Sequence, residues 1–183
     1  MLIKSEMTAF GTTTSMNTYY DGNKSRTEID VPGMAKSILI HLPNEEVMYQ
    51  YVYGEETGVK MTGANASYAE EMGLMMDTSM LAEITDASSE DMIARVETLD
   101  GEEVIYIEAT QSDEDMGDVL VKMWYSKKYA TPLKYEVYMG ETLMTNLKVI
   151  KITDSIRFSG DEFVPPKDVT FQEMDMQSMM AEW

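Results

Sequence analysis

The chain has 183 residues, enough for one domain that buries about two-thirds of its unfolded surface and too few for a second large core. Its 14 Lys and Arg against 33 Asp and Glu give a net charge of -19, which disfavours nucleic acid as a partner. Because the chain has no Cys, disulfides, thiolate nucleophiles and most structural zinc sites are excluded.

The first third of the chain predicts an antiparallel sheet. Short segments rich in Val, Ile, Thr and Tyr are separated by turn residues. Gly22-Asn23 favours a hairpin turn, since Gly and Asn tolerate a positive φ. The predicted strands are Leu2–Phe10, Thr18–Tyr20, Ser25–Val31, Lys36–Leu42 and Val47–Tyr53. Because the chain starts directly in a strand, we expect that an upstream leader was removed.

The middle of the chain predicts a helix. Ser67 to Glu70 forms a capping box before an apolar run that ends near Ile84. Gly73 interrupts the run, so two short helices are an alternative. Four methionines share one stripe of the helix: Met72, Met75, Met76 and Met80.

The second half predicts long antiparallel strands with one apolar face. Asp100-Gly101 is the strongest hairpin signal. The predicted strands are Ile93–Leu99, Glu102–Ala109, Asp118–Ser126, Leu133–Met139 and Thr142–Ile152. Alternation places these side chains on one face: Val121, Met123, Tyr125, Tyr135 and Val137. We also expect a final helical turn over Asp175–Trp183. The sequence contains no run of about 18 apolar residues that could span a bilayer.

Catalytic and metal chemistry find little support in the residues. His41 is the one histidine, and no G-x-S-x-G elbow exists to supply a nucleophile beside it. We therefore expect His41 to be structural or exposed. The acidic stretch Asp113 to Asp118 fails the EF-hand spacing, because Gly117 comes one place early. We expect that the protein is not an enzyme and that it has no cofactor and no metal site.

Methionine is the unusual feature, with 19 in the chain. Flexible, polarizable thioethers suit a surface that adapts to ligands of varied shape. The plainer interpretation of any single Met is core filler in place of Leu. Soft-metal binding by the helical methionines is a weaker alternative, since they follow helical packing and form no tight M-x-M cluster.

Three stretches resemble the LolA-like superfamily of periplasmic lipoprotein carriers and related lipoproteins. They are Tyr19 to Glu28, Met123 to Ile152 with its Thr131-Pro132-Leu133-Lys134-Tyr135 segment, and Phe163 to Val169. The resemblance implies a mainly β (α+β) fold: a single domain, residues 1–183, with a strongly curved antiparallel sheet. This sheet would be an unclosed half-barrel, with short helices covering its concave face.

The resemblance also implies a latch. In the carriers an arginine at the position of Arg26 holds the helical lid, although Ser25 and Thr27 stand here where those proteins carry aromatic residues. Ser126 likewise stands where an Asp is common. These departures mean that the substrate can differ from that of the carriers.

The sequence thus predicts a non-enzymatic, extracytoplasmic binding or carrier protein, periplasmic or anchored as a lipoprotein. Its apolar concave sheet would hold lipid or acyl chains, or an acylated protein, under the Met-rich lid. We expect a monomer. The alternative is a protein-interaction or envelope-sensor domain without a lipid ligand, contacting an envelope protein. A hydrolase with buried carboxylates is the third and least supported hypothesis.

Overall fold

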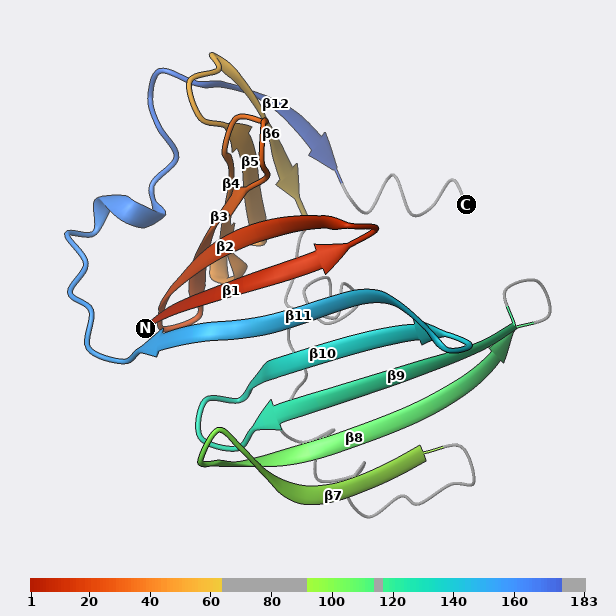
Figure 1. Ribbon diagram of the computed structural model, residues 1–183. Coiled ribbons are helices and arrows are strands. Elements are labelled where there is room, and N and C mark those ends of the chain that lie inside the picture. Colours follow the sequence, from red (N-terminus) through yellow and green to blue (C-terminus); the bar gives the residue numbers. More distant parts are fainter. Residues whose placement is uncertain (64–91, 114–116, 176–183) are drawn as a thin grey trace. The chain divides into compact units, whose positions relative to one another are not determined.

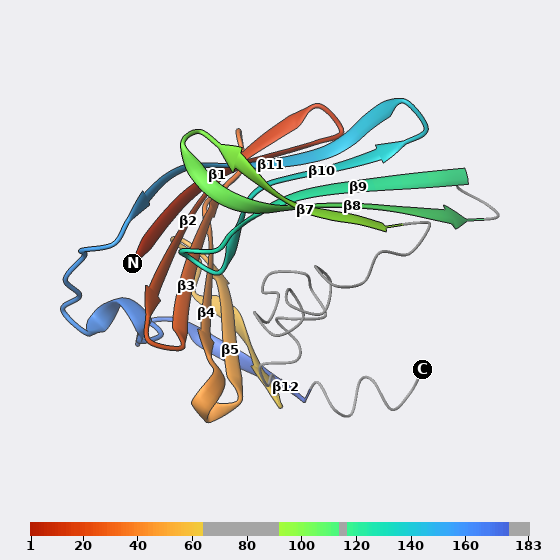
Figure 2. The same cartoon turned by 90° about the horizontal axis from the view of Figure 1, so that it is seen from below.

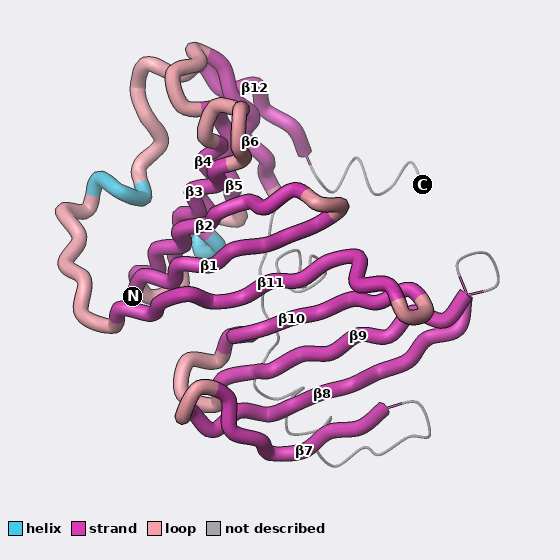
Figure 3. Tube along the Cα trace, viewed as in Figure 1, coloured by secondary structure: helices cyan, strands magenta, loops and turns pink. Residues whose placement is uncertain are grey.

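A computed structural model describes residues 1–63, 92–113 and 117–175 (Figure 1). These residues are mainly β, with two short 3-10 turns, η1 (Pro43–Glu45) and η2 (Asp161–Phe163), as Figure 3 shows. The strands are β1 (Leu2–Ala9), β2 (Thr12–Asp21), β3 (Lys24–Asp30), β4 (Ser37–Leu42), β5 (Val47–Val52), β6 (Thr57–Thr62), β7 (Met92–Leu99), β8 (Glu102–Asp113), β9 (Gly117–Ser126), β10 (Thr131–Met139), β11 (Thr142–Thr153) and β12 (Thr170–Asp175).

The strands form one twelve-stranded sheet whose order leaves two edges. The order is β12-β6-β5-β4-β3-β2-β1-β11-β10-β9-β8-β7. Mainly consecutive strands are neighbours, as expected for hairpin connections. Two neighbour pairs are not consecutive in the chain, β1 with β11 and β12 with β6. β12 runs parallel to β6. The predicted mainly β class with an unclosed strand order is confirmed.

The predicted helices cannot be placed. The expected helix over residues 67–84 lies outside the described residues. So does the expected final turn, apart from Asp175, which is the last residue of β12. The helical cover of the sheet therefore stays a prediction.

The fold divides into two compact units. Unit 1 comprises residues 1–5, 14–72 and 150–183, and unit 2 comprises residues 6–13 and 73–149. β1, β2 and β11 each contribute residues to both units. The single domain over residues 1–183 stays a prediction.

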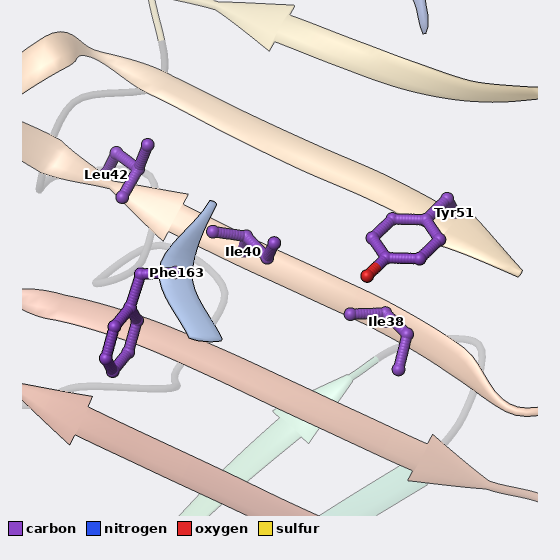
Figure 4. Close-up of a cluster of buried hydrophobic side chains, with 5 residues drawn as sticks. All are labelled: Ile38, Ile40, Leu42, Tyr51 and Phe163. Carbon is purple, nitrogen blue, oxygen red and sulfur yellow. The ribbon is translucent and has the colours of Figure 1, made fainter. Parts of the chain in front are cut away.

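Unit 1 has its core on one face of β4 and β5. Ile38, Ile40 and Leu42 alternate along β4 and are almost fully buried. They cluster with Tyr51 of β5 and with Phe163 of η2 (Figure 4). The segment after β11 thus returns to cover an apolar face that the strand period creates.

Unit 2 is built from long hairpins. Asp100 and Gly101 have φ values of 51° and 87°, so the turn between β7 and β8 uses the left-handed region at both positions, as Asp-Gly predicts. β8, β9 and β10 pair antiparallel along most of their length and run side by side in Figures 1 and 2. The register between β9 and β10 shifts between Pro132 and Lys134, where proline cannot donate a ladder hydrogen bond.

Ten of the strands correspond to predicted segments, and nine of them agree to within a few residues. β2 extends well before Thr18. β6 and β12 were not predicted. Gly58 lies inside β6, where a glycine usually argues against a strand. A Cβ at this position would lie 2.8 Å from the Gln50 carbonyl oxygen, 2.8 Å from Phe171 Cε1 and 2.9 Å from Tyr51 Cβ. Gly58 therefore permits the close packing of β12 and β5 on β6.

We expect Gly58→Ala to destabilise the protein by about 1–3 kcal/mol, the usual cost of overpacking a tight site. Urea denaturation followed by circular dichroism measures the change. Thr57→Ala is the matched control, because Thr57 is exposed in the same strand and should change stability by about 0.5 kcal/mol or less. Equal stability of the two variants would contradict the close-packing account.

Candidate functional site

The side chains predicted to line the binding sheet share one face of unit 2, and we call them the wall residues: Val121, Met123, Tyr125, Tyr135 and Val137. β9 and β10 pair Met123 with Tyr135 and Val121 with Val137. Cross-strand partners point to the same side of a sheet, so these four side chains form two adjacent rows. Tyr125 lies on the same face, because it is two residues beyond Met123 in β9, and it is fully buried.

β8 extends this face, which the sequence analysis did not include. Ile105 and Ile107 stand opposite Tyr125 and Met123 in the register. They are 8% and 7% exposed and cluster with Tyr125, with Met92 and Met123 packed against them. We define the apolar face of unit 2 as Ile105, Ile107, Val121, Met123, Tyr125, Tyr135 and Val137. The alternation of Ile105 and Ile107 was the signal that could have found them.

The Tyr135 side chain on this face is partly removed from water. Burial raises the pKa of the Tyr135 phenol above its ordinary value. The other side chains of the face carry no charge, so it offers apolar area and two hydroxyls, those of Tyr125 and Tyr135. Such a surface can bind hydrocarbon by burial and has no group suited to general acid–base chemistry at neutral pH.

The opposite face of unit 2 carries a row of cations and aromatic rings. Arg95 Cζ lies 4.2 Å from the centroid of the Tyr106 ring, which lies 5.0 Å from the Trp124 centroid. Lys134 Nζ lies 4.2 Å from the Trp124 centroid on its other side. The register pairs these residues across β7, β8, β9 and β10. Cation–π contacts therefore bind four strands together on this face.

A second row on the same face consists of ion pairs. Lys122 Nζ lies 3.9 Å from Glu108 Oε2, and Lys134 Nζ lies 2.7 Å from Glu136 Oε1. Burial alone would raise the pKa of Glu136, but hydrogen bonds from Lys134 and Tyr138 and the charge of Lys122 hold that pKa below its usual value. The two faces of unit 2 thus differ sharply in polarity.

Arg26 fixes the closing segment of unit 1. Its Nη1 donates to the Glu162 carbonyl oxygen at 3.2 Å and to Tyr51 Oη at 3.4 Å. Its Nη2 and Nε donate to Glu28 Oε1, and Glu28 also pairs with Lys36. Arg26 therefore holds η2 against β3 and β5. Its predicted role as a lid latch stays an analogy, because the predicted lid is outside the described residues.

The turn that receives Arg26 is itself stabilised by a carboxylate. The backbone N–H of Ser159 donates to Glu162 Oε1 at 3.0 Å, and that of Gly160 donates to Oε2 at 3.0 Å. These donors lower the pKa of Glu162. The Glu162 carbonyl is thus presented to Arg26 by a locally ordered turn.

The predicted lid methionines, Met72, Met75, Met76 and Met80, all lie outside the described residues. Two surface hollows within the described part of the chain contain none of the predicted wall residues. One, of about 250 Å³, lies beside Phe10 and Leu143, and the other, of about 500 Å³, lies beside Tyr51 and Phe171. The ligand-binding role of the wall and lid therefore stays a prediction.

Within residues 1–63, 92–113 and 117–175, no three His, Asp or Glu side chains gather in a way that could hold a metal ion. No helix in those ranges is long and apolar enough to cross a membrane.

Comparisons with known proteins show the fold. The chain matches no known family model and no curated protein. It is similar to MucB in complex with MucA(peri), over 93% of this chain and 56% of that chain, with 9% identity and a TM-score of 0.50. The MucA/MucB complex of Pseudomonas aeruginosa is similar over 93% of this chain and 57% of that chain, with 10% identity and a TM-score of 0.50.

A solved domain from Vibrio parahaemolyticus, named for outer membrane lipoprotein sorting, is similar over 88% of each chain. Its identity is 12% and its TM-score is 0.36, too low to carry an argument. This chain spans little more than half of the MucB chains that it matches. The likeness is thus one of fold.

We expect Arg26→Met to destabilise the protein by about 1–3 kcal/mol, because the substitution removes charged hydrogen bonds from partly buried acceptors. It should also speed proteolytic cleavage within residues 154–169. Arg157→Met is the matched control, since Arg157 is exposed in the same segment. Urea denaturation and limited proteolysis measure both effects, and equal behaviour of the two variants would contradict the role of Arg26.

Proposed function

We propose that this chain is a non-enzymatic, extracytoplasmic binding or carrier protein that holds lipid or acyl chains against the apolar face of unit 2. The observation that carries the proposal is the continuity of that face across β8, β9 and β10. Each methylene that leaves water contributes about 0.8 kcal/mol, so partial burial of one acyl chain gives useful affinity. Met72, Met75, Met76 and Met80 would cover the bound chain.

The distribution of charge supports this proposal. The charged rows of unit 2 lie on the face opposite the proposed site, so an acyl chain would meet no buried ion pair there. The net charge of -19 disfavours stable adsorption to anionic membranes. An apolar binding face together with a negative net charge suits a carrier, because the protein would take up the apolar group without remaining on the bilayer.

A protein partner is the second candidate function. MucB, whose fold this chain shares at a TM-score of 0.50, has been solved in complex with MucA(peri). β7 is an edge strand of the sheet, and an edge strand offers unpaired backbone groups to an added peptide strand. In this function the apolar face would be filled by the chain's own residues, and an envelope protein would be bound instead of lipid.

Among the described residues, the carboxyl groups whose pKa is shifted do not support the hydrolase hypothesis. The pKa values of Glu136 and Glu162 are both shifted downward, whereas a general acid needs a raised pKa.

Val121→Asp tests the acyl-binding proposal. A carboxylate on the apolar face must lose its hydration when hydrocarbon binds, so we expect at least a tenfold lower affinity for a fluorescent fatty acid. Leu120→Asp is the matched control, because Leu120 lies on the opposite face of the same strand. Its affinity should stay within threefold of the wild type.

Native mass spectrometry and organic extraction of protein from a lipid-rich cell complete this test. We expect bound acyl species on the wild type and fewer on Val121→Asp and Met76→Glu. Bare protein that also fails to bind the fluorescent fatty acid would overturn the carrier proposal and leave the protein partner as the function to pursue.

A further inference from the structure

The one histidine of the chain stands in a row with three methionines. In unit 1, the register pairs His41 of β4 with Met48 of β5, Met48 with Met61 of β6, and Met61 with Met174 of β12. None of these pairings contains a register shift. β4, β5, β6 and β12 follow one another in the sheet (Figure 1).

The strand period puts these four side chains on one face. Their sequence neighbours Ile40, Tyr49, Lys60 and Glu173 form the adjacent row on the opposite face, where Lys60 Nζ contacts Glu173 Oε1 at 2.9 Å. Directly opposite residues in an antiparallel pair have Cβ atoms about 4.5–5.5 Å apart. His41 and Met61 therefore flank Met48 at a distance that their side chains can span.

His41 has an unsatisfied nitrogen. The residue is 8% exposed, and its Nε2 is buried without a hydrogen-bond partner. Buried polar atoms in folded proteins are rarely left unpaired, so such an atom requires an explanation. The side chain directly opposite is Met48, which is 6% exposed and offers a thioether sulfur. Imidazole nitrogen and thioether sulfur are both ligand types for soft metal ions.

The ligand types select the metal. Thioether sulfur prefers Cu(I), and imidazole also binds copper. The cross-strand neighbours of this row on the same face are uncharged: Ser25, Thr27, Leu39, Gln50, Val59 and Gln172. Ca²⁺ and Mg²⁺ require several oxygen ligands, and structural Zn²⁺ requires thiolate, imidazole or carboxylate at four positions. The row supplies neither set.

We propose that His41 Nε2, Met48 Sδ and Met61 Sδ form a binding site for Cu(I), with Met174 at the far end of the row as a further thioether. The site lies within unit 1 and shares no residue with the apolar face of unit 2. Its ligands come from three strands of one sheet, so folding assembles it. The binding involves no redox step, because Cu(I) enters and stays in that state.

Ag(I) is the redox-inert probe for the first test, with the full chain. Because His41 is the single histidine, its imidazole gives one set of ¹⁵N signals. One equivalent of Ag(I) should shift the Nε2 signal strongly and shift one or more methionine ε-methyl signals. An unchanged Nε2 signal at one equivalent would overturn the proposal, including the case where metal binds to methionines elsewhere.

Competition against a chromophoric Cu(I) chelator under anaerobic conditions is the second test. Met48→Leu and Met61→Leu nearly conserve volume and should each weaken Cu(I) binding at least tenfold. Met34→Leu is the matched control, because Met34 is exposed and lies outside the row. Equal affinities for all three variants would contradict the site, and the histidine signal of the wild type decides the matter if a variant fails to fold.

Discussion

The two-residue period of the β-strand is the constraint on which the rest of this structure depends. In β9 it sends Val121, Met123 and Tyr125 to one side and Lys122 and Trp124 to the other. A register slip of one residue would exchange these two sets. The cation–π row and the ion pairs of unit 2 oppose such a slip, since they form in one register alone. The contacts on the charged face thus fix the register that keeps the apolar side chains on the other face.

The same constraint operates in unit 1 with a different outcome. There one face of β4 and β5 is covered by the segment that follows β11, which Arg26 and the Glu162 turn hold in place. The other face carries His41 and the methionine row. The two proposals thus assign hydrocarbon to one unit and a soft metal ion to the other. Both depend on side chains that lie far apart in the sequence and adjacent in the register.

Local signals were sufficient for most strands and insufficient for their contacts. Asp100-Gly101 and Gly22-Asn23 predicted hairpins because turn chemistry is local, and alternation predicted the shared face of Val121 and Met123 correctly. β12 was missed because it pairs in parallel with a strand more than a hundred residues earlier, as the 113-residue separation of Lys60 and Glu173 shows. No local pattern reports such a pairing.

The neighbours of His41 could not be predicted, because the sequence does not show which strands pair or in which register. From sequence His41 was a lone residue at a strand end, expected to be structural or exposed, and it is buried. Its proximity to Met48 and Met61 follows from two strand pairings. One of them involves β6, which was not predicted because Gly58 argues against a strand. The role of Arg26 was open for the same reason, because its acceptor at Glu162 lies 136 residues away.

The most direct measurement of the central claim is photo-crosslinking with a fatty acid that carries a diazirine on its chain, followed by peptide mapping. The account predicts labels on the residues of the apolar face, above all Val121, Met123, Tyr135 and Val137. Leu120, Lys122 and Glu136 should remain unlabelled. Labels distributed equally over both faces of β9 and β10, or confined to other parts of the chain, would contradict the account.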